Sequence, residues 1–164
     1  LAASRRKQFS EDDFHRHHPG GMLGAGLRSV SEVMRFKVDE HIPVVSQDCT
    51  VEQALQDAWL TDAPRRAGAL MLVDDNGLLS GIFTDGDLRR ALRDHGPERW
   101  SALTAEDLMT SDPITVSTDL LAVDAIKRME HNRRKPISVL PVVDQHDLLL
   151  GLLRLHDLVQ AGLA

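Results

Sequence analysis

Short apolar runs alternate with segments of helical periodicity from about residue 43 onward. Val51, Ala54 and Leu55 recur at the spacing that places apolar side chains on one face of a helix. The apolar runs further along are bounded by turn-forming residues such as Asn76 and Gly77, which is typical of strands joined by a hairpin. The pattern predicts a strand, a helix, two strands and a helix, in that order, over residues 43–45, 51–58, 69–73, 78–83 and 85–93.

The same order of elements occurs a second time. Gly81 and Gly151 are 70 residues apart (151 − 81), and Asp87 and Asp157 are separated by the same number (157 − 87). A repeat of this length is a supersecondary unit that closes its core by packing against its twin. We therefore expect an α/β (α+β) fold of two β-α-β-β-α repeats packed with pseudo-two-fold symmetry. The second repeat is predicted to have strands at 114–116, 139–143 and 148–153, and helices at 122–129 and 155–161.

These repeats divide the chain into a leading segment, residues 1–28, and two repeats, residues 29–95 and 102–164. Pro19 and the glycines after it would interrupt any helix in the leading segment, which we interpret as a linker or the remnant of a preceding domain. Three histidines lie within residues 15–18, but they lack a cysteine or an acidic partner at fixed spacing. We therefore predict no metal site.

Composition narrows the class of function. The chain is 42% hydrophobic and 27% charged, as in an ordinary globular protein, and no apolar run approaches the ~20 residues that span a bilayer. It also has no signal-peptide pattern at its start, so we expect a cytoplasmic protein that does not enter membranes. A net charge of −6 and few aromatic residues argue against nucleic-acid binding. Cys49 is the single cysteine, and its apolar neighbourhood indicates a buried small residue.

A polar turn at residues 84–87 joins the strand that ends at Phe83 to the helix that follows. The start of a helix leaves backbone N–H groups that can receive an anion. Thr84 offers a hydroxyl there, and Asp87 offers a carboxylate that can accept two hydrogen bonds from the vicinal hydroxyls of a ribose. The same two residues match a helix capping box, in which both side chains bond the helix's own backbone donors. The residues alone leave both interpretations open.

The motif and the repeat together resemble a known family. Gly81, Thr84 and Asp87 match the pattern Gly-x-apolar-Thr/Ser-x-x-Asp, and the order of elements is kept from about residue 30 to residue 161. In both respects the chain resembles the cystathionine-β-synthase (CBS) domain family. The resemblance implies a tandem pair that binds adenosyl or other nucleotide ligands and regulates an enzyme or a transporter.

The resemblance also implies where the ligand lies. In the family it occupies the cleft between the two copies, with the Thr and the Asp of the motif on the ribose and the backbone near Gly68 and Ala69 beside the base. The predicted ligand-binding residues are Gly68, Ala69, Thr84 and Asp87 in the first copy and Ser138, Val139, Arg154 and Asp157 in the second.

The second copy departs from the pattern, because Arg154 stands where Thr is expected. Arginine cannot act as an N-cap acceptor, whereas its cationic fork beside Asp157 suits a ligand with phosphate or carboxylate groups. The alternative for Arg154 is an ion-paired surface residue. The basic run at residues 133–135 could add phosphate contacts, although such runs are more often solvated faces. We therefore expect two unequal clefts.

A narrower resemblance concerns the two ends of the chain. Residues 14–24, leading into residues 30–34, are similar to the junction in D-arabinose 5-phosphate isomerases of the KpsF/GutQ type, and residues 81–90 and 156–158 agree with it too. Those enzymes carry a sugar-isomerase (SIS) domain followed by a CBS pair, and their product feeds synthesis of Kdo, the sugar acid of Gram-negative lipopolysaccharide. The resemblance implies that His18 belongs to the isomerase site of the missing SIS domain. We therefore expect no catalytic residue in this chain.

The leading hypothesis is a non-catalytic regulatory CBS pair that needs no cofactor. Its ligand would be a nucleotide or nucleotide sugar, with CMP-Kdo as the candidate feedback effector. Its expected partners are the SIS domain of the same polypeptide and a second copy of the chain, through CBS–CBS contacts. The alternatives are a structural oligomerisation module and a free-standing adenine-nucleotide sensor. An isomerase within this chain would need a base–acid pair that the sequence does not supply.

Overall fold

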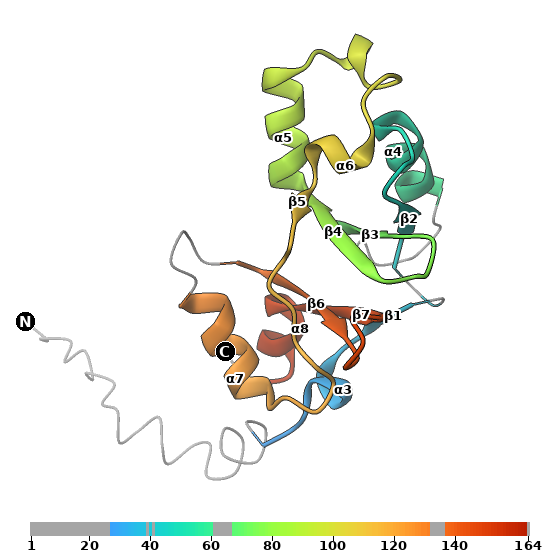
Figure 1. Ribbon diagram of the computed structural model, residues 1–164. Helices are drawn as coiled ribbons and strands as arrows, with labels where there is room; N and C mark the ends of the chain where they lie inside the picture. The colour runs from blue at the N-terminus through green and yellow to red at the C-terminus, as the bar shows by residue number, and fades with distance from the viewer. Residues whose placement is uncertain (1–26, 39, 41, 61–66, 132–136, 164) are drawn as a thin grey trace, which may run out of the picture.

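The computed structural model of the chain describes residues 27–38, 40, 42–60, 67–131 and 137–163. The helices are α3 (Val30–Val33), α4 (Val51–Leu60), α5 (Asp85–Asp94), α6 (Ala105–Leu108), α7 (Ala122–Glu130) and α8 (Leu155–Gln160), with a 3-10 turn at Pro97–Arg99. The strands are β1 (Phe36–Lys37), β2 (Val44–Ser46), β3 (Ala69–Val73), β4 (Leu79–Thr84), β5 (Thr110–Ser111), β6 (Val139–Val143) and β7 (Leu149–Arg154). Figure 1 shows them in two groups, with α4, α5 and α6 beside β2 to β5, and α3, α7 and α8 beside β1, β6 and β7.

The predicted helices and central strands of both repeats are confirmed, with ends that differ by one or two residues. The strand predicted at 114–116 is wrong, because only Val116 pairs with β6, where its N–H donates to the Pro141 oxygen at 3.0 Å. In the first repeat the Met71 N–H donates to the Pro43 oxygen at 3.1 Å. Pro141 stands 70 residues after Met71 (141 − 71) and has no N–H, so the corresponding bond cannot form.

Each sheet contains a short strand from the beginning of the other repeat. The strand orders are β2-β3-β4-β5 and β1-β7-β6. Phe36 of β1 pairs with Leu152 of β7, and Thr110 of β5 pairs with Ile82 of β4. This exchange was not predicted, because strands of 2 residues are too short to show an alternating pattern.

The short helices that precede these strands are exchanged in the same way. The Val30 N–H of α3 donates to the Leu120 oxygen of the second repeat, and the Ala105 N–H of α6 donates to the Cys49 oxygen of the first repeat, both at 2.8 Å. Figure 1 shows α6 on the side of α4 and α5, and α3 on the side of β7 and α7. The two repeats are therefore held together by the chain segments that enter them.

The glycine of each motif makes room for a methionine from an exchanged segment. A Cβ added to Gly81 would overlap the Met109 sulfur, and a Cβ added to Gly151 would overlap the Met34 sulfur and lie 2.5 Å from the Phe36 oxygen. Both glycines are buried in a strand. Packing against the exchanged segment therefore accounts for the glycine of the motif.

The two sheets meet at a backbone bridge between Leu78 and Leu148. These residues are 70 apart (148 − 78), so each occupies the same position in its repeat and the bridge lies on the pseudo-two-fold axis. Beside it the Leu79 N–H donates to the Asp147 oxygen at 3.1 Å. The predicted pseudo-two-fold packing is thus centred on the ends of the two hairpins.

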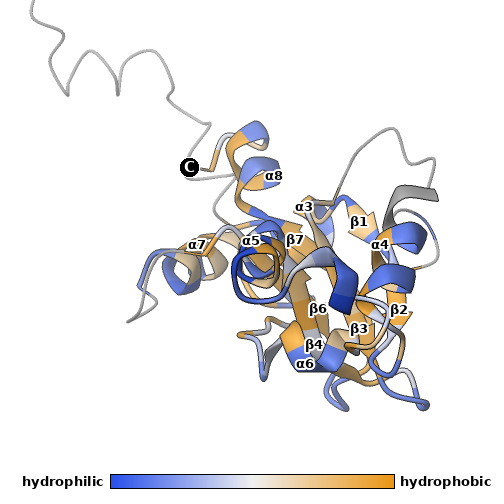
Figure 2. Cartoon of the chain, turned by 90° about the horizontal axis from the view of Figure 1, so that it is seen from above, coloured by the Kyte–Doolittle hydropathy of each residue, from blue (hydrophilic) through white to orange (hydrophobic). Residues whose placement is uncertain are grey.

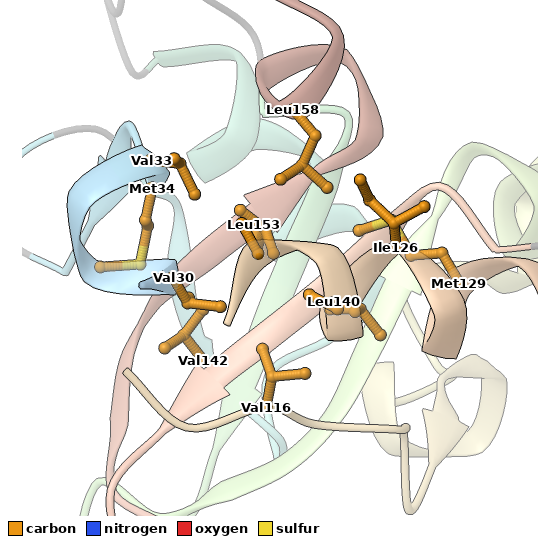
Figure 3. Packing of buried hydrophobic residues seen from close by; sticks show 12 residues of the cluster. Val30, Val33, Met34, Val116, Ile126, Met129, Leu140, Val142, Leu153 and Leu158 are labelled. Atoms are coloured by element: carbon orange, nitrogen blue, oxygen red, sulfur yellow. The ribbon is translucent and has the colours of Figure 1, made fainter. Parts of the chain in front are cut away.

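The core is divided among three clusters of buried apolar side chains. In one of them, Val30 of the exchanged helix α3 and Met34, which follows that helix, lie beside Leu153 and Leu158 of the second repeat (Figure 3). Figure 2 shows the strands largely in hydrophobic colours, whereas helices such as α8 also carry hydrophilic residues. Full burial of a side chain such as Val30, which is 0% exposed, contributes about 1.5–3 kcal/mol, so the exchanged segment is a structural part of the second repeat.

Membrane-spanning helices and metal sites, neither of which the sequence predicts, can be looked for in the described residues. None of the helices there is both long and apolar enough to cross a membrane. No group of three or more His, Cys, Asp or Glu side chains suited to a metal occurs among these residues, and residues 15–18 lie outside them. Cys49 is half-buried, and burial raises the pKa of its thiol.

Candidate functional site

A cleft of about 830 Å3 is lined by residues of both repeats. The first repeat contributes the end of β4 and the start of α5, and the second contributes the residues around the start of β6. Residues 110–114, near the beginning of the second repeat, form a further part of the lining. The cleft residues are Gly68, Ile82, Thr84, Asp85, Gly86, Asp87, Arg90, Thr110, Ser111, Asp112, Pro113, Ile114, Ile137, Ser138, Val139 and Pro141.

Thr84 and Asp87 reach this cleft because β4 ends at Thr84 and α5 begins immediately after it. The backbone N–H and the hydroxyl of Thr84 both donate to Oδ2 of Asp87, at 2.7 and 2.6 Å. This is the capping geometry that the sequence left as an alternative. One carboxylate oxygen of Asp87 is therefore used by the helix start.

The other oxygen of Asp87 bonds to two side chains that line the cleft. Arg90 forms an ion pair with Oδ1, and the Thr110 hydroxyl donates to the same atom at 3.3 Å. A carboxylate can accept about four hydrogen bonds, one at each lone-pair site, so the four donors that contact Asp87 occupy all of these sites. A ligand hydroxyl that bonds Asp87 must therefore replace Thr110 or Arg90.

These two partners differ in how readily they can be replaced. The Thr110 bond is long for an O–H donor, and the Arg90 side chain is 47% exposed although Asp87 is only 2% exposed. Of the two carboxylate oxygens of Asp87, Oδ1 is thus the one whose partners lie outside the capping box.

The charged side chains that line the described part of the cleft are Asp85, Asp87, Asp112 and Arg90. Three carboxylates favour a ligand that presents hydrogen-bond donors, and they disfavour a dense cluster of phosphates. Arg90 supplies a cation for one anionic group. The remaining lining is largely apolar and includes Ile82 and Ile137, which suits the face of a planar base.

The second motif lies apart from this lining. Arg154 donates through Nε and Nη2 to the two carboxylate oxygens of Asp157, at 2.9 and 2.7 Å. Its guanidinium lies 4.1 Å from the centroid of the Phe36 ring. Neither Arg154 nor Asp157 is among the cleft residues, so a ligand contact by either stays a prediction.

Of the predicted binding residues, Gly68, Thr84, Asp87, Ser138 and Val139 line one and the same cleft. Ala69 follows Gly68 as the first residue of β3 and is buried. His18 and the basic run at residues 133–135 lie outside the described residues.

Arg90, Thr110 and the residues after Thr110 were missed by the sequence reasoning. The signal for Arg90 was present, because a side chain three residues after Asp87 lies on the same face of a helix. Thr110 reaches the first motif through the pairing of β5 with β4, and no pattern in the sequence predicts this pairing. Residues 110–114 are thus part of the candidate site only through the exchange of strands.

A family model for the CBS domain matches residues 30–94 and 105–164. The chain belongs to the CBS domain family. A CBS pair is a regulatory type of domain, and its two motifs here are those that end in Asp87 and Asp157.

Curated relatives of this CBS pair are named arabinose 5-phosphate isomerases. It is 39% identical over 163 residues to KdsD of Pseudomonas aeruginosa, which covers 99% of this chain and 47% of the relative. It is 34% identical over 158 residues to KpsF of Escherichia coli, covering 96% of this chain and 44% of the relative. The CBS pair thus spans about half the length of these relatives, as the narrower resemblance implied.

Solved CBS pairs share the fold. CBSX2 of Arabidopsis thaliana in complex with AMP superposes with a TM-score of 0.63 at 25% identity, covering 82% of this chain and 96% of that one. The CBS pair of MJ0100 in complex with 5′-methylthioadenosine and S-adenosyl-L-methionine gives a TM-score of 0.64 at 22% identity, covering 80% and 97%. The predicted fold class is confirmed by these likenesses.

Proposed function

We propose that this CBS pair is the regulatory part of an arabinose 5-phosphate isomerase and binds a nucleotide or nucleotide sugar in the cleft between its repeats. The observation that carries the proposal is the position of Asp87, whose Oδ1 bonds to two other residues of the cleft lining, Arg90 and Thr110, which a ligand would replace. The names of the curated relatives support the parent enzyme, and the AMP complex of CBSX2 supports the ligand class.

The cleft fits a nucleoside in size and in chemistry. Its volume of about 830 Å3 falls within the range of about 300–1,000 Å3 that is usual for ligand pockets. The ribose hydroxyls donate to Asp87, and the base lies against the apolar lining near Ile82, Ile137 and Gly68. Gly68 has a φ of +77° and open space where a Cβ would be, so the backbone there can approach the base closely.

CMP-Kdo is the candidate feedback ligand, because it joins a ribose to a single phosphodiester and one carboxylate. Its acid groups were expected near Arg154, but that side chain is paired with Asp157. Arg90 is the basic side chain of the described lining, so the anionic part of the ligand is assigned to it. This charge pattern predicts weaker binding of ATP, which brings three phosphates toward Asp85 and Asp112.

Regulation follows from the partner that the ribose displaces. Thr110 lies near the beginning of the second repeat, and Ser111 and Asp112 beside it line the cleft. A ligand that takes Oδ1 of Asp87 releases Thr110 and changes the balance between arrangements of the two repeats. In the parent enzyme this change would reach the SIS domain and the second copy of the chain, because effector and substrate affinities are linked.

Titration calorimetry of the chain with CMP-Kdo, CMP, AMP and ATP tests the proposal. CMP-Kdo or a monophosphate should bind, and Asp87→Ala should weaken binding at least about tenfold, as expected for a lost charged hydrogen-bond acceptor. Asp107→Ala is the matched control, because Asp107 caps α6 in the same way and does not line the cleft. Absence of binding by all four compounds would overturn the ligand assignment.

A structural module is the second candidate, favoured by the four donors that already surround Asp87. It predicts that Asp87→Ala lowers the free energy of unfolding by about 1 kcal/mol, the value of a lost cap, and alters nothing else. The effect on ligand affinity therefore separates the two candidates. A response to adenine nucleotides alone would instead favour the free-standing sensor.

A further inference from the structure

Each of the two motifs lies beside a residue from the short strand of the other repeat, and these two residues are of different chemical types. Ile82 and Leu152 occupy the same position in their repeats, 70 residues apart (152 − 82). Thr110 pairs with Ile82, and Phe36 pairs with Leu152. The place that a small hydroxyl side chain takes beside the first motif is therefore taken by an aromatic ring beside the second.

The motifs themselves also differ in one side chain, and this difference accompanies the change of neighbour. Thr84 is replaced at the equivalent position by Arg154, whose guanidinium forms two hydrogen bonds to Asp157 and lies over the Phe36 ring. Both carboxylate oxygens of Asp157 thus accept from arginine. A planar guanidinium between a carboxylate and an aromatic face satisfies charge and stacking together.

Burial shows how firmly this arrangement is held. Asp157 is fully buried, Phe36 is 1% exposed and the Arg154 side chain is 16% exposed. By contrast, Arg90, the cationic partner of Asp87, is 47% exposed. A ribose at the second motif would have to separate a buried ion pair and move a buried ring, whereas at the first it replaces two accessible donors.

We propose that the second motif is a clamp, in which Arg154 ties β1 to the second repeat and excludes a ligand, so that each chain binds one nucleotide ligand at the first motif. The stoichiometry of one ligand per chain rests on the proposed function, whereas the role of Arg154 as a clamp does not. Because β1 belongs to the segment that follows residues 1–28, the clamp fixes the direction in which the chain enters the pair.

The first measurement is the stoichiometry of CMP-Kdo and AMP binding by titration calorimetry of the unmodified chain. The proposal expects one ligand per chain, lost in Asp87→Ala and kept in Asp157→Asn. Two ligands per chain would overturn the proposal and leave the proposed function intact. No binding at all would overturn the proposed function and, with it, the count of one.

The second measurement needs no ligand. The Val38 N–H, just after β1, donates to the Leu150 oxygen at 3.1 Å, and its hydrogen exchange can be followed by NMR. Arg154→Thr, which restores the residue of the first motif, should speed exchange at Val38 at least about tenfold. Exchange at Asn76, whose N–H bonds to Asp74 in the other repeat, should stay unchanged.

Equal exchange at Val38 in Arg154→Thr and in the unmodified chain would overturn the clamp. If Arg154→Thr does not fold, Arg154→Lys serves instead, because lysine keeps the charge but cannot make the two parallel bonds to Asp157. It should speed exchange at Val38 in the same direction, and unchanged exchange there would again overturn the clamp.

Discussion

The hydroxyl of Thr110 donates to Oδ1 of Asp87 at 3.3 Å, and so joins the beginning of the second repeat to the candidate ligand site of the first. Thr110→Val removes this donor while keeping the shape of the side chain. Because the ligand's ribose no longer has to displace it, affinity should rise between about twofold and tenfold, the worth of one net hydrogen bond. Calorimetry with CMP-Kdo or AMP measures the change, and weaker binding would contradict the assigned competition.

Gly81→Ala tests the packing of the exchanged segment. The new Cβ would overlap the Met109 sulfur, so the free energy of unfolding should fall by about 1–3 kcal/mol. Gly86→Ala is the control, because Gly86 lies in α5 with a contact of 3.5 Å and no positive φ. It should be neutral or stabilising by up to about 1 kcal/mol. Equal effects in urea denaturation would contradict the packing account.

Asp157→Asn tests the buried ion pair. The substitution leaves Arg154 buried without its counter-charge, which should lower the free energy of unfolding by about 3–5 kcal/mol. Asp124→Asn removes a partner from the pair with Lys127, which has the same spacing but is exposed on both sides, and should cost at most about 1 kcal/mol. A loss for Asp157→Asn no larger than for Asp124→Asn would show that the clamp adds little.

The caps of the exchanged helices give stability a defined dependence on pH. The Ser29 N–H lowers the pKa of Glu32, and the Thr104 N–H lowers the pKa of Asp107, with the hydroxyls of the same residues adding to both. Because these pKa values are lower in the folded chain than in the unfolded one, the stabilisation is present above about pH 4 and is lost as the pH falls.

Glu32→Gln with Asp107→Asn should therefore flatten the acid side of the stability curve. The measurement is the melting temperature between about pH 3 and pH 7, and the variant should differ most from the unmodified chain at the upper end of this range. A constant difference at every pH would show that the two carboxylates stabilise the caps by shape instead of by charge.

The repeat made much of the fold predictable, because equal spacing of Gly81 and Gly151 fixed two copies of one unit. The exchange of β1 and β5 was not predictable, since it depends on contacts such as Phe36 with Leu152 that are distant in sequence. The strand at 114–116 failed for a local reason that the sequence did contain, the missing N–H of Pro141.

The part of the candidate site that lies at the end of β4 and the start of α5 was predictable from the sequence. Thr84 and Asp87 were found on their spacing, and the cleft brings Ser138 and Val139 to them. Arg154 was expected to face the ligand because it departs from the motif. The departure is accounted for by Phe36, a residue 118 positions earlier (154 − 36), and only the tertiary structure brings the two together.

The most direct test of the account is an NMR titration of the chain with CMP-Kdo, with AMP as the second ligand. We expect the amide signals of Thr84, Gly86 and Ser111 to shift as ligand is added, and those of Arg154 and Asp157 to stay in place. Shifts centred on Arg154, or no shift with either ligand, would contradict the claim that the first motif is the ligand site of this CBS pair.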